Sequence, residues 1–388
     1  MTALPLDGLK IISFEQYGAA PYATMFLADL GADVVKVEGA DGDYARKTGP
    51  LTLGEADSLY YQCFNLNKRS LILDLKADTD RALLHRLVAD SHAVVNNLRG
   101  SLPAKLGLDH AALSAVNPRI VCGHISAYGR TGSRADWPGY DFLMQAEAGF
   151  MALTGDPGSP PTRVGLSMVD YMTGMMMAFG LVSAIRGAER SGIGMDVDVS
   201  LFDAALHQLA YQGTWYLNEG VITRQTPRSA HPSTVPVQLY KTADGWLYIC
   251  CMNQKFWEIL VRLIGRPELG ADPRFADLAS RRENRDVLTD VLDAVFMTRT
   301  RAEWMQILQG QIPAAPVESL DGAIDNPRPA WCRTCRIQPA GRSGCSRTHY
   351  VSTARVFRSA LRLGWMRMVR RCAVAFPPTL PEGGICEA

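Results

Sequence analysis

A strand–helix–strand pattern near the N-terminus constrains the fold more than any other feature of the chain. Leu9–Phe14 is apolar and predicts a strand, Tyr22–Leu30 predicts a helix, and Ala32–Glu38 predicts a second strand. Gly31 ends the helix between them. Such a unit joins two parallel strands by a crossover helix, so we expect a parallel, Rossmann-like sheet. The pattern lacks GxGxxG, the usual dinucleotide-binding fingerprint.

The same alternation of strands and helices continues along the chain and suggests two domains. Further strands are expected at 70–74, 93–96, 119–125 and 195–199, with helices at 78–90, 109–116, 171–190 and 201–219. Residues 1–221 therefore predict a large α/β domain. Residues 222–237 are polar and contain prolines, which is typical of a linker or an active-site loop. Strands at 238–240 and 246–251 and helices at 254–264, 282–296 and 301–309 predict a smaller α+β domain over 238–327.

The length of 388 residues is sufficient for two or three domains, each with its own core. Charges or glycines interrupt the longest apolar stretches before bilayer length, so we expect no membrane-spanning segment. The N-terminus lacks the basic start and the apolar run of a secretory signal. We therefore expect a cytoplasmic protein without a membrane partner.

The last segment, residues 328–388, has a different composition from the rest of the chain. It contains 11 arginines and no lysine against two glutamates, and it holds five of the nine cysteines. One pair, Cys332 and Cys335, is a CxxC, but the other cysteines supply no second pair at a familiar zinc-binding spacing, so we predict no metal site. The composition favours translation in a shifted reading frame over an evolved tail. Because the basic excess is confined to this segment, nucleic acid is not expected as a partner.

Asp170 is the residue at which we expect chemistry. It lies where a long apolar helix begins, among unpaired N–H groups and at the positive end of the helix dipole. This setting predicts an ionised carboxylate, which can attack an activated acyl group. The alternative interpretation is an ordinary N-cap aspartate.

An ordered series of motifs resembles one known family. No single motif is specific, but their order and spacing are. The series includes Leu27–Glu38, Gly42-Asp43 with Arg46, Asn65–Ser70, Leu73–Lys76, Asn97–Arg99, Lys105–Leu108, Gly129–Gly132, Pro138–Asp141 with Gln145, Val169-Asp170 with Gly174, and Gly194–Ser200. From about Leu6 to Pro327 the chain resembles the class III coenzyme A transferases, the superfamily of formyl-CoA transferase, carnitine CoA-transferase and α-methylacyl-CoA racemase.

The resemblance implies a large Rossmann-like domain, a small domain and a C-terminal segment that returns to the large one. It also implies a homodimer in which two subunits thread through each other like linked rings. Residues 328–388 stand where the returning segment of the family would be, and they depart from its pattern.

The resemblance also implies the chemistry. Asp170 matches the catalytic aspartate of the family, which attacks an acyl-CoA thioester and then carries CoA as an aspartyl thioester to a second acid. Coenzyme A and its thioesters would be substrates rather than permanently bound cofactors, and the other partner would be a small carboxylic acid. Neither step requires a metal.

Several positions match CoA contacts of the family or are basic residues suited to its phosphates. They are Gln16, Tyr17, Gly18, Lys68, Leu73, Asp74, Leu75, Lys76, Asn97, Leu98, Arg99 and Lys105. Gln16 is also expected beside the reacting groups. Relatives often carry arginine at the position of Lys105, a change that keeps the charge but loses bidentate geometry.

Tyr140 and Asp141 separate the branches of this superfamily. Racemases carry histidine at the position of Tyr140, and a phenol with a pKa of about 10 is poorly suited to moving an α-proton at neutral pH. Asp141 matches an acidic site residue of the transferases, and His231 lies in the loop that closes over substrate in relatives. We therefore favour a CoA-transferase, with a racemase-like isomerase or an inactive CoA-binding remnant as alternatives.

Overall fold

The structure is a computed structural model that describes residues 4–54 and 56–326. In it the chain forms two compact units. The described part of the first unit runs to Met144 and continues with Leu166–Gln208, and the second comprises Gln145–Gly165 and Leu209–Asn326. Residues 328–388 lie outside the described residues, so their interpretation stays a prediction. The division into domains at residues 1–221 and 238–327, which the sequence suggests, also stays a prediction.

The first unit is built on a parallel sheet of six strands in the order β3-β2-β1-β4-β5-β6. The strands are β1 (Lys10–Phe14), β2 (Asp33–Glu38), β3 (Arg69–Ile72), β4 (Ala93–Asn96), β5 (Val121–Ser126) and β6 (Asp196–Ser200). The order reverses between β1 and β4, where Ile12 pairs with Val35 on one side and Val94 on the other. The expected parallel sheet is confirmed, and this reversal is where open α/β sheets bind ligands.

Helices cover both faces of this sheet, which explains why its central strands are apolar throughout. The first unit contains α1 (Ala19–Asp29), the short 3-10 turn η1 (Tyr44–Lys47), α2 (Leu59–Asn65), α3 (Asp78–Ala89), α4 (Leu102–Lys105), α5 (His110–Leu113), the start of α6 (Asp141–Glu147), α8 (Met168–Ser191) and α9 (Leu201–Gln208). Leu84 and Val88 of α3 pack with Ile12 and Val94 on one face. On the other, Gly123 of β5 leaves room for Met177 of α8.

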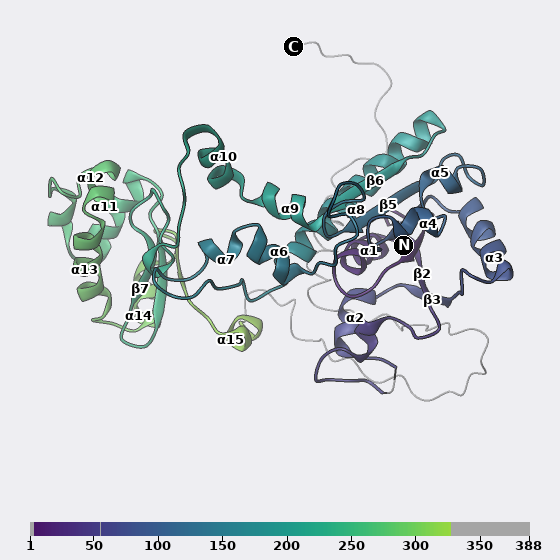
Figure 1. Cartoon of the computed structure of the whole chain (residues 1–388). Coiled ribbons are helices and arrows are strands. Elements are labelled where there is room, and N and C mark those ends of the chain that lie inside the picture. The colour runs from purple at the N-terminus through teal and green to yellow at the C-terminus, as the bar shows by residue number, and fades with distance from the viewer. Residues whose placement is uncertain (1–3, 55, 327–388) are drawn as a thin grey trace, which may run out of the picture. The chain divides into compact units, whose positions relative to one another are not determined.

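Helix α8 lies against α1, β5 and β6, and it runs beside α1 in Figure 1. Its buried positions recur every three or four residues, as they do in a core helix: Val169, Thr173, Met177, Leu181, Ala184 and Ala188. At 24 residues α8 is nevertheless long and apolar enough for a membrane span. We expected no segment to be long and apolar enough to span a membrane, and by this criterion of length and composition the expectation is wrong. The core helix of a soluble protein also meets the criterion.

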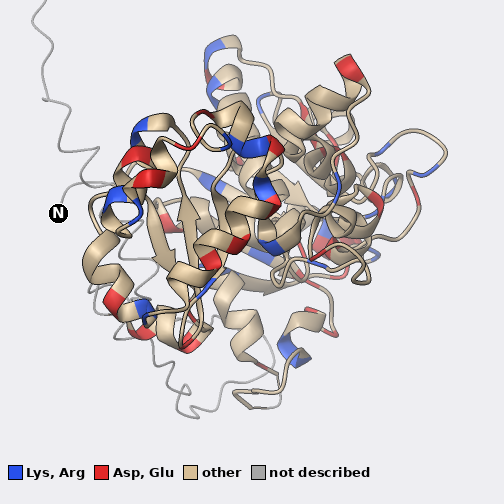
Figure 2. Cartoon of the chain, turned by 90° about the vertical axis from the view of Figure 1, so that its left-hand side faces the viewer, with Lys and Arg blue, Asp and Glu red and all other residues tan. Residues whose placement is uncertain are grey.

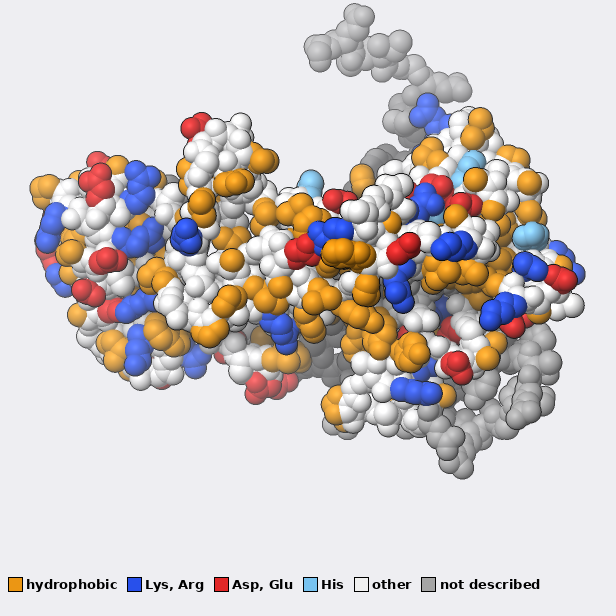
Figure 3. Space-filling view, in the orientation of Figure 1, with side chains coloured by type: hydrophobic (Ala, Val, Ile, Leu, Met, Phe, Trp, Pro, Cys, Tyr) orange, Lys and Arg blue, Asp and Glu red, His pale blue; other side chains and the backbone are white. Residues whose placement is uncertain are grey.

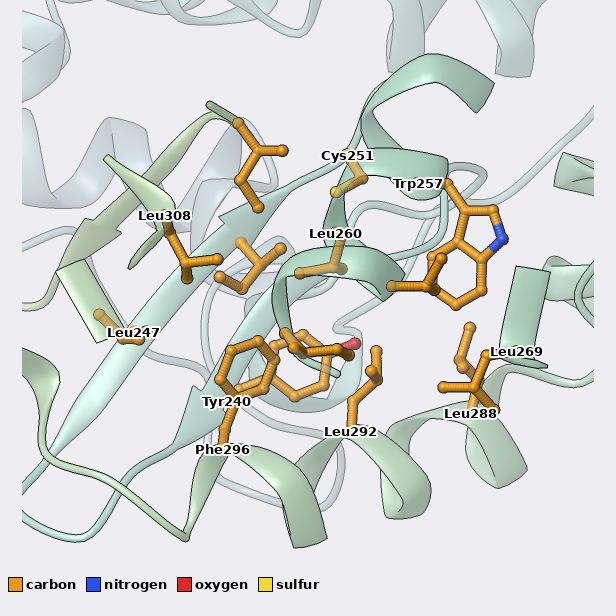
Figure 4. Packing of buried hydrophobic residues seen from close by; sticks show 14 of the residues in the cluster. Tyr240, Leu247, Cys251, Trp257, Leu260, Leu269, Leu288, Leu292, Phe296 and Leu308 are labelled. Carbon is orange, nitrogen blue, oxygen red and sulfur yellow. The ribbon is translucent and has the colours of Figure 1, made fainter. Parts of the chain in front are cut away.

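The second unit combines an antiparallel sheet with helices, as the sequence predicts. Its strands are β7 (Val237–Lys241), β8 (Trp246–Cys250) and β9 (Ala314–Pro316). Its helices and 3-10 turns are α7 (Phe150–Leu153), α10 (Ala210–Glu219), η2 (Pro227–Ser229), α11 (Gln254–Leu263), η3 (Pro267–Gly270), α12 (Leu278–Glu283), α13 (Arg285–Phe296), α14 (Arg301–Leu308) and α15 (Leu320–Asp325). Trp257, Tyr240 and Phe296 pack in one core with aliphatic residues of the helices (Figure 4). Basic and acidic residues are interspersed along the helices that face the viewer in Figure 2.

Three of the expected helices are shorter or broken. The helix expected over 201–219 is two helices, because Ala210 takes a left-handed conformation with φ 45°. The helix expected over 282–296 is interrupted at Asn284, whose ψ of 28° departs from helical values. The helix expected over 109–116 is a single turn, His110–Leu113, which begins after Asp109 caps the amide of Ala112.

One segment of the second unit interrupts the first. The chain leaves the first unit within α6 and returns just before α8, so Gln145–Gly165 belongs to the second unit. The fully buried side chain of Gln145 accepts a hydrogen bond from the amide of Val164, with 2.9 Å between Oε1 and N. This bond ties the outgoing chain to the returning chain.

Candidate active site

Asp170 lies in the first turn of α8 but does not cap it. The helix begins at Met168, its N-cap residue is Ser167, and Asp170 is the third helical residue. The alternative interpretation of Asp170 as an N-cap aspartate is therefore wrong. Its side chain is free of the local capping bond that would otherwise hold a carboxylate at this position.

Asp141 caps α8 from outside the helix. Its Oδ2 atom accepts hydrogen bonds from the amides of Val169, at 2.7 Å, and Asp170, at 3.1 Å. Asp141 is the first residue of α6, 3% exposed, and it is brought to α8 by tertiary structure rather than by sequence proximity. The positive end of the α8 dipole thus stabilises the charge of Asp141 rather than that of Asp170.

This arrangement changes the expected charge of Asp170. Burial and the nearby carboxylate of Asp141 raise the pKa of Asp170 from 3.8 to about 7. Burial favours the neutral form, and repulsion between two carboxylates adds to it. The helix terminus was expected to keep Asp170 ionised, but its amides bond to Asp141 instead, and the pKa of Asp170 is raised rather than lowered.

Two glycines allow the carboxylate of Asp170 to lie against the start of α1. Gly18 is the N-cap residue of α1, and a Cβ atom there would overlap Oδ2 of Asp170 and lie 3.2 Å from its Cγ. A Cβ on Gly174 would lie 2.6 Å from the carbonyl oxygen of Ala19. Only glycine therefore permits α8 to approach α1 this closely and leaves space for the carboxylate.

Tyrosines surround this end of the site. The ring of Tyr17 makes edge contacts with Tyr140 and Tyr60, with ring centroids 6.3 and 6.5 Å apart. Burial, and then the carboxylate of Asp170, raise the pKa of Tyr60. Tyr140 is 63% exposed, so its ring is available to a ligand. Asp170, Asp141, Tyr17, Gly18 and Tyr60 are thus brought to one region.

A cleft of about 280 Å³ opens at the carboxyl ends of β1 to β4, beside the reversal in strand order. Its lining includes Phe14, Glu38, Asp43 and Leu106. It also includes six residues expected to contact CoA: Gln16, Leu73, Asp74, Leu75, Lys76 and Leu98. Of these, the exposed Lys76 supplies a cation at the cleft.

Lys68 cannot serve as a phosphate contact in this structure, contrary to expectation. Its ammonium group is buried, donates to Glu15 at 2.7 Å and to the carbonyl of Pro21 at 2.8 Å, and has a side chain only 2% exposed. Burial lowers the pKa of Lys68 to about 8, although Glu15 favours the charged form. Lys68 therefore balances a buried acid beneath the site.

Asn97 also has a structural role. Its side chain accepts from the amide of Gln16 at 3.0 Å and donates to the carbonyl of Gln16 at 2.7 Å. These two bonds fasten the loop after β1 to the loop after β4. Arg99 and Lys105 are exposed. Both lie near Asp136, whose pKa is lowered mainly by hydrogen bonds from Ser101 and to a smaller extent by these two cations. Neither lines the cleft.

His231 belongs to the second unit, whereas Asp170 belongs to the first. Its Nδ1 atom accepts from the amides of Ser233 and Thr234, at 3.2 and 3.1 Å, and its ring contacts Tyr211. Its imidazole therefore organises the turn that precedes β7.

The sequence reasoning missed the buried ionic network under the loop after β1. Lys36 donates to Asp43 at 2.5 Å and to Asn65 at 2.9 Å, and all three are buried. Burial opposes the ionisation of Glu38, but Arg46 and Ser70 hold its pKa at about 2. The available signal was the presence of Lys36 and Glu38 in the buried part of β2, after the exposed Asp33, since buried charges require partners.

Comparison with known proteins identifies a family. Residues 6–333 match the family described as CoA-transferase family III. The chain is 34% identical over 340 residues to the acetyl-CoA:oxalate CoA-transferase of Acetobacter aceti, which covers 87% of this chain and 86% of that protein. It is 35% identical over 330 residues to the succinyl-CoA:mesaconate CoA-transferase of Haloarcula hispanica, which covers 83% of this chain and 82% of that protein.

Solved structures give the same result. A CAIB/BAIF family protein from Brucella suis superposes with a TM-score of 0.76 at 31% identity, over 95% of this chain and 100% of that one. Rv3272 from Mycobacterium tuberculosis superposes with a TM-score of 0.76 at 32% identity, over 84% of this chain and 88% of that one.

Proposed function

This chain belongs to CoA-transferase family III, and we propose that it moves coenzyme A between two small organic acids through a thioester on Asp170. It is a CoA-transferase by family, and its relatives act on oxalate, glutarate, mesaconate and citramalate. The single observation that carries the proposal is the position of Asp170, a partly buried carboxylate with a pKa near 7 against the glycine start of α1.

The reaction begins when an oxygen of Asp170 attacks the thioester carbonyl of the donor. The carbon–sulfur bond breaks, CoA leaves as the thiolate, and an aspartyl–acyl anhydride remains. The thiolate then attacks the aspartyl carbonyl, and the donor acid leaves as its carboxylate. The product is a thioester between Asp170 and CoA.

The acceptor acid reverses these steps. Its carboxylate attacks the aspartyl thioester and releases the thiolate, which then attacks the acceptor carbonyl of the new anhydride. The acceptor becomes its CoA thioester and Asp170 returns as the free carboxylate. No proton is consumed overall, and the energy of the first thioester is retained in the second.

The environment of Asp170 favours this use of a carboxylate. A carboxylate with a pKa near 7 is more basic, and hence more nucleophilic, than one with a pKa near 4. Acylation also removes its negative charge, which relieves the repulsion from Asp141 and the penalty of burial. The hydrogen bonds of Asp141 run to backbone amides of α8 and do not involve the reacting side chain of Asp170.

The cleft at the carboxyl ends of the strands is the proposed CoA site. It adjoins Gln16, which is two residues before Gly18, so a ligand in the cleft can extend toward Asp170. Lys76 is the cation that we assign to the phosphates of CoA. Arg99 and Lys105 remain proposals for the outer part of the ligand.

A homodimer is proposed as the working form. Within the described residues, α8 exposes Met175 and Phe179, at 57% and 79%, and α10 exposes Tyr216 and Leu217, at 59% and 81%. Figure 3 shows hydrophobic side chains on the visible surface of both units. Exposed apolar side chains of this size on two helices are typical of an interface. A cytoplasmic location also remains a proposal.

The enzymatic alternative is an isomerase of the racemase type. Tyr140 disfavours it, because an exposed phenol is a poor base for an α-proton at neutral pH. Exchange of deuterium at the α-carbon of an acyl-CoA, without transfer to a second acid, would favour the isomerase. A CoA-binding remnant would bind CoA and catalyse neither reaction.

The test is to trap the aspartyl thioester. The protein is incubated with acyl-CoA donors and treated with hydroxylamine or borohydride, and its tryptic peptides are analysed by mass spectrometry. The modification is expected on the peptide 164–186, which contains Asp170 and no other carboxylate before Arg186. An active protein that carries no adduct on this peptide, or an Asp170→Asn protein that transfers CoA at the wild-type rate, would contradict the proposal.

A further inference from the structure

Three consecutive residues of the loop after β1 face three different parts of the site. Gln16 lines the cleft at the carboxyl ends of the strands. Gly18 lies against the carboxylate of Asp170. Tyr17, between them, does not line the cleft and instead contacts other tyrosine rings. Tyr17 therefore lies in the loop between the residue that lines the cleft and the residue that contacts the nucleophile Asp170.

Tyr17 reaches this position through an unfavourable backbone conformation. Its φ is 61°, in the left-handed region that residues with a Cβ rarely adopt. Such a conformation persists only where the surroundings hold it. Here Asn97 binds the backbone of Gln16 on both sides, and Asp43 accepts from the amide of Tyr17 at 3.4 Å. Asp43 is itself fixed by its buried ion pair with Lys36.

The ring of Tyr17 is the centre of a group of four tyrosines, which we call the tyrosine collar: Tyr17, Tyr44, Tyr60 and Tyr140. Tyr17 stacks on Tyr44, with centroids 6.4 Å apart and an interplanar angle of 10°. It makes edge contacts with Tyr60 and Tyr140 at 74° and 82°. No other member of the collar has a ring contact with all the rest among the described residues.

The collar stands beside the reacting carboxylate. The pKa of the Tyr60 phenol is raised mainly by burial and next by the carboxylate of Asp170, so the two side chains lie near each other. The residue next to Tyr17, Gly18, is in contact with Asp170. An acyl group attached to Asp170 would therefore lie next to phenol rings of the collar. Their faces and edges suit a few methylene groups, and their hydroxyls can donate to a remote carboxylate.

We propose that Tyr17 sets the length of the acyl group that the enzyme accepts, by closing the tyrosine collar over Asp170 and so selecting short-chain acids. This rests on the proposed function of Asp170 as the acyl acceptor. It assigns chain-length selection to the loop after β1, in the first unit.

Exchange of a labelled acid into its own CoA thioester measures this selection without knowledge of the natural acids. The probes are acetyl-CoA with labelled acetate and octanoyl-CoA with labelled octanoate, each with the full-length protein. The variant is Tyr17→Gly, because glycine adopts a left-handed φ without strain and so removes the ring alone. Tyr17→Phe, which keeps the ring, is the matched control.

The wild type and Tyr17→Phe are expected to prefer the acetyl donor. In Tyr17→Gly the ratio of kcat/KM for octanoyl-CoA to that for acetyl-CoA should rise by roughly 10-fold or more, as a pocket enlarged by a side chain predicts. If Tyr17→Gly does not accumulate as folded protein, Tyr17→Asn carries the same test, since asparagine also tolerates this φ.

An unchanged ratio, or an equal loss for both donors, would overturn the assignment of Tyr17 while leaving the proposed function intact. A different result would contradict the proposed function itself. In that case the wild type gives no exchange with any donor, or active protein carries no adduct on the peptide that contains Asp170.

Discussion

Replacement of Asp170 by asparagine should make the protein more stable while it abolishes CoA transfer. The carboxylate is placed where burial and Asp141 both disfavour its charge, so the folded protein holds it at a free-energy cost. Asparagine has nearly the same shape and no charge to lose. The variant therefore removes the penalty without leaving a cavity.

The magnitude and pH range follow from the pKa of Asp170. The rise from 3.8 to about 7 corresponds to about 4 kcal/mol if the carboxylate is fully shielded. For a side chain held at this pKa, the gain expected for the variant above pH 7 is therefore about 4 kcal/mol. The pKa of Asp170 is higher in the folded protein than in the unfolded chain. The free energy of unfolding of the wild type therefore falls by this amount as the pH rises from about 4 to about 7. The advantage of the variant should grow over that interval and then level off.

Urea denaturation monitored by tryptophan fluorescence, at pH 5 and pH 8, measures the effect. At pH 5 less than half of the gain is expected, and at pH 8 all of it. The control is Asp290→Asn, which changes an exposed carboxylate on α13 and should give a difference near zero at both values. An Asp170→Asn protein that is less stable than the wild type, or equally more stable at both pH values, would refute the account of the site given above.

Further substitutions test the same geometry. Asp141→Asn can still accept from the α8 amides but lacks the charge, so the rising limb of kcat/KM, expected near pH 7, should move down by about one pH unit in a pH–rate profile. Gly18→Ala should displace the carboxylate and lower kcat by roughly 100-fold in steady-state transfer, with an unchanged circular dichroism spectrum. Lys68→Met leaves Glu15 buried and unpaired and should lower the free energy of unfolding by about 3 kcal/mol in urea denaturation. Lys76→Met, at an exposed position, should instead raise the KM for acyl-CoA and leave that free energy unchanged.

Much of the fold could be predicted because its signals are local. The strand–helix–strand pattern around Gly31 needs only nearby residues, and the structure confirms it, with Gly31 at a φ of 110°. The breaks at Ala210 and Asn284 could not be predicted, because neither residue type demands the conformation that it adopts there.

The candidate site shows the same division between local and tertiary effects. The sequence singles out Asp170 because a carboxylate at the start of an apolar helix is a local pattern. Its pKa depends on Asp141, 29 residues away, which occupies the helix terminus in its place. Lys68 was expected to meet phosphate because it lies between other polar residues, but its partner Glu15 is 53 residues earlier in the chain. Such pairings arise only when the sheet assembles.

The excursion of the chain between α6 and α8 has an evolutionary consequence. Asp141 and Asp170 stand on either side of it, and the bond between Gln145 and Val164 closes its neck. An insertion or deletion between these two residues changes the length of a segment whose two ends are held together by this hydrogen bond. We therefore expect relatives to differ in length between residues 146 and 163, while the two carboxylates keep their positions relative to each other.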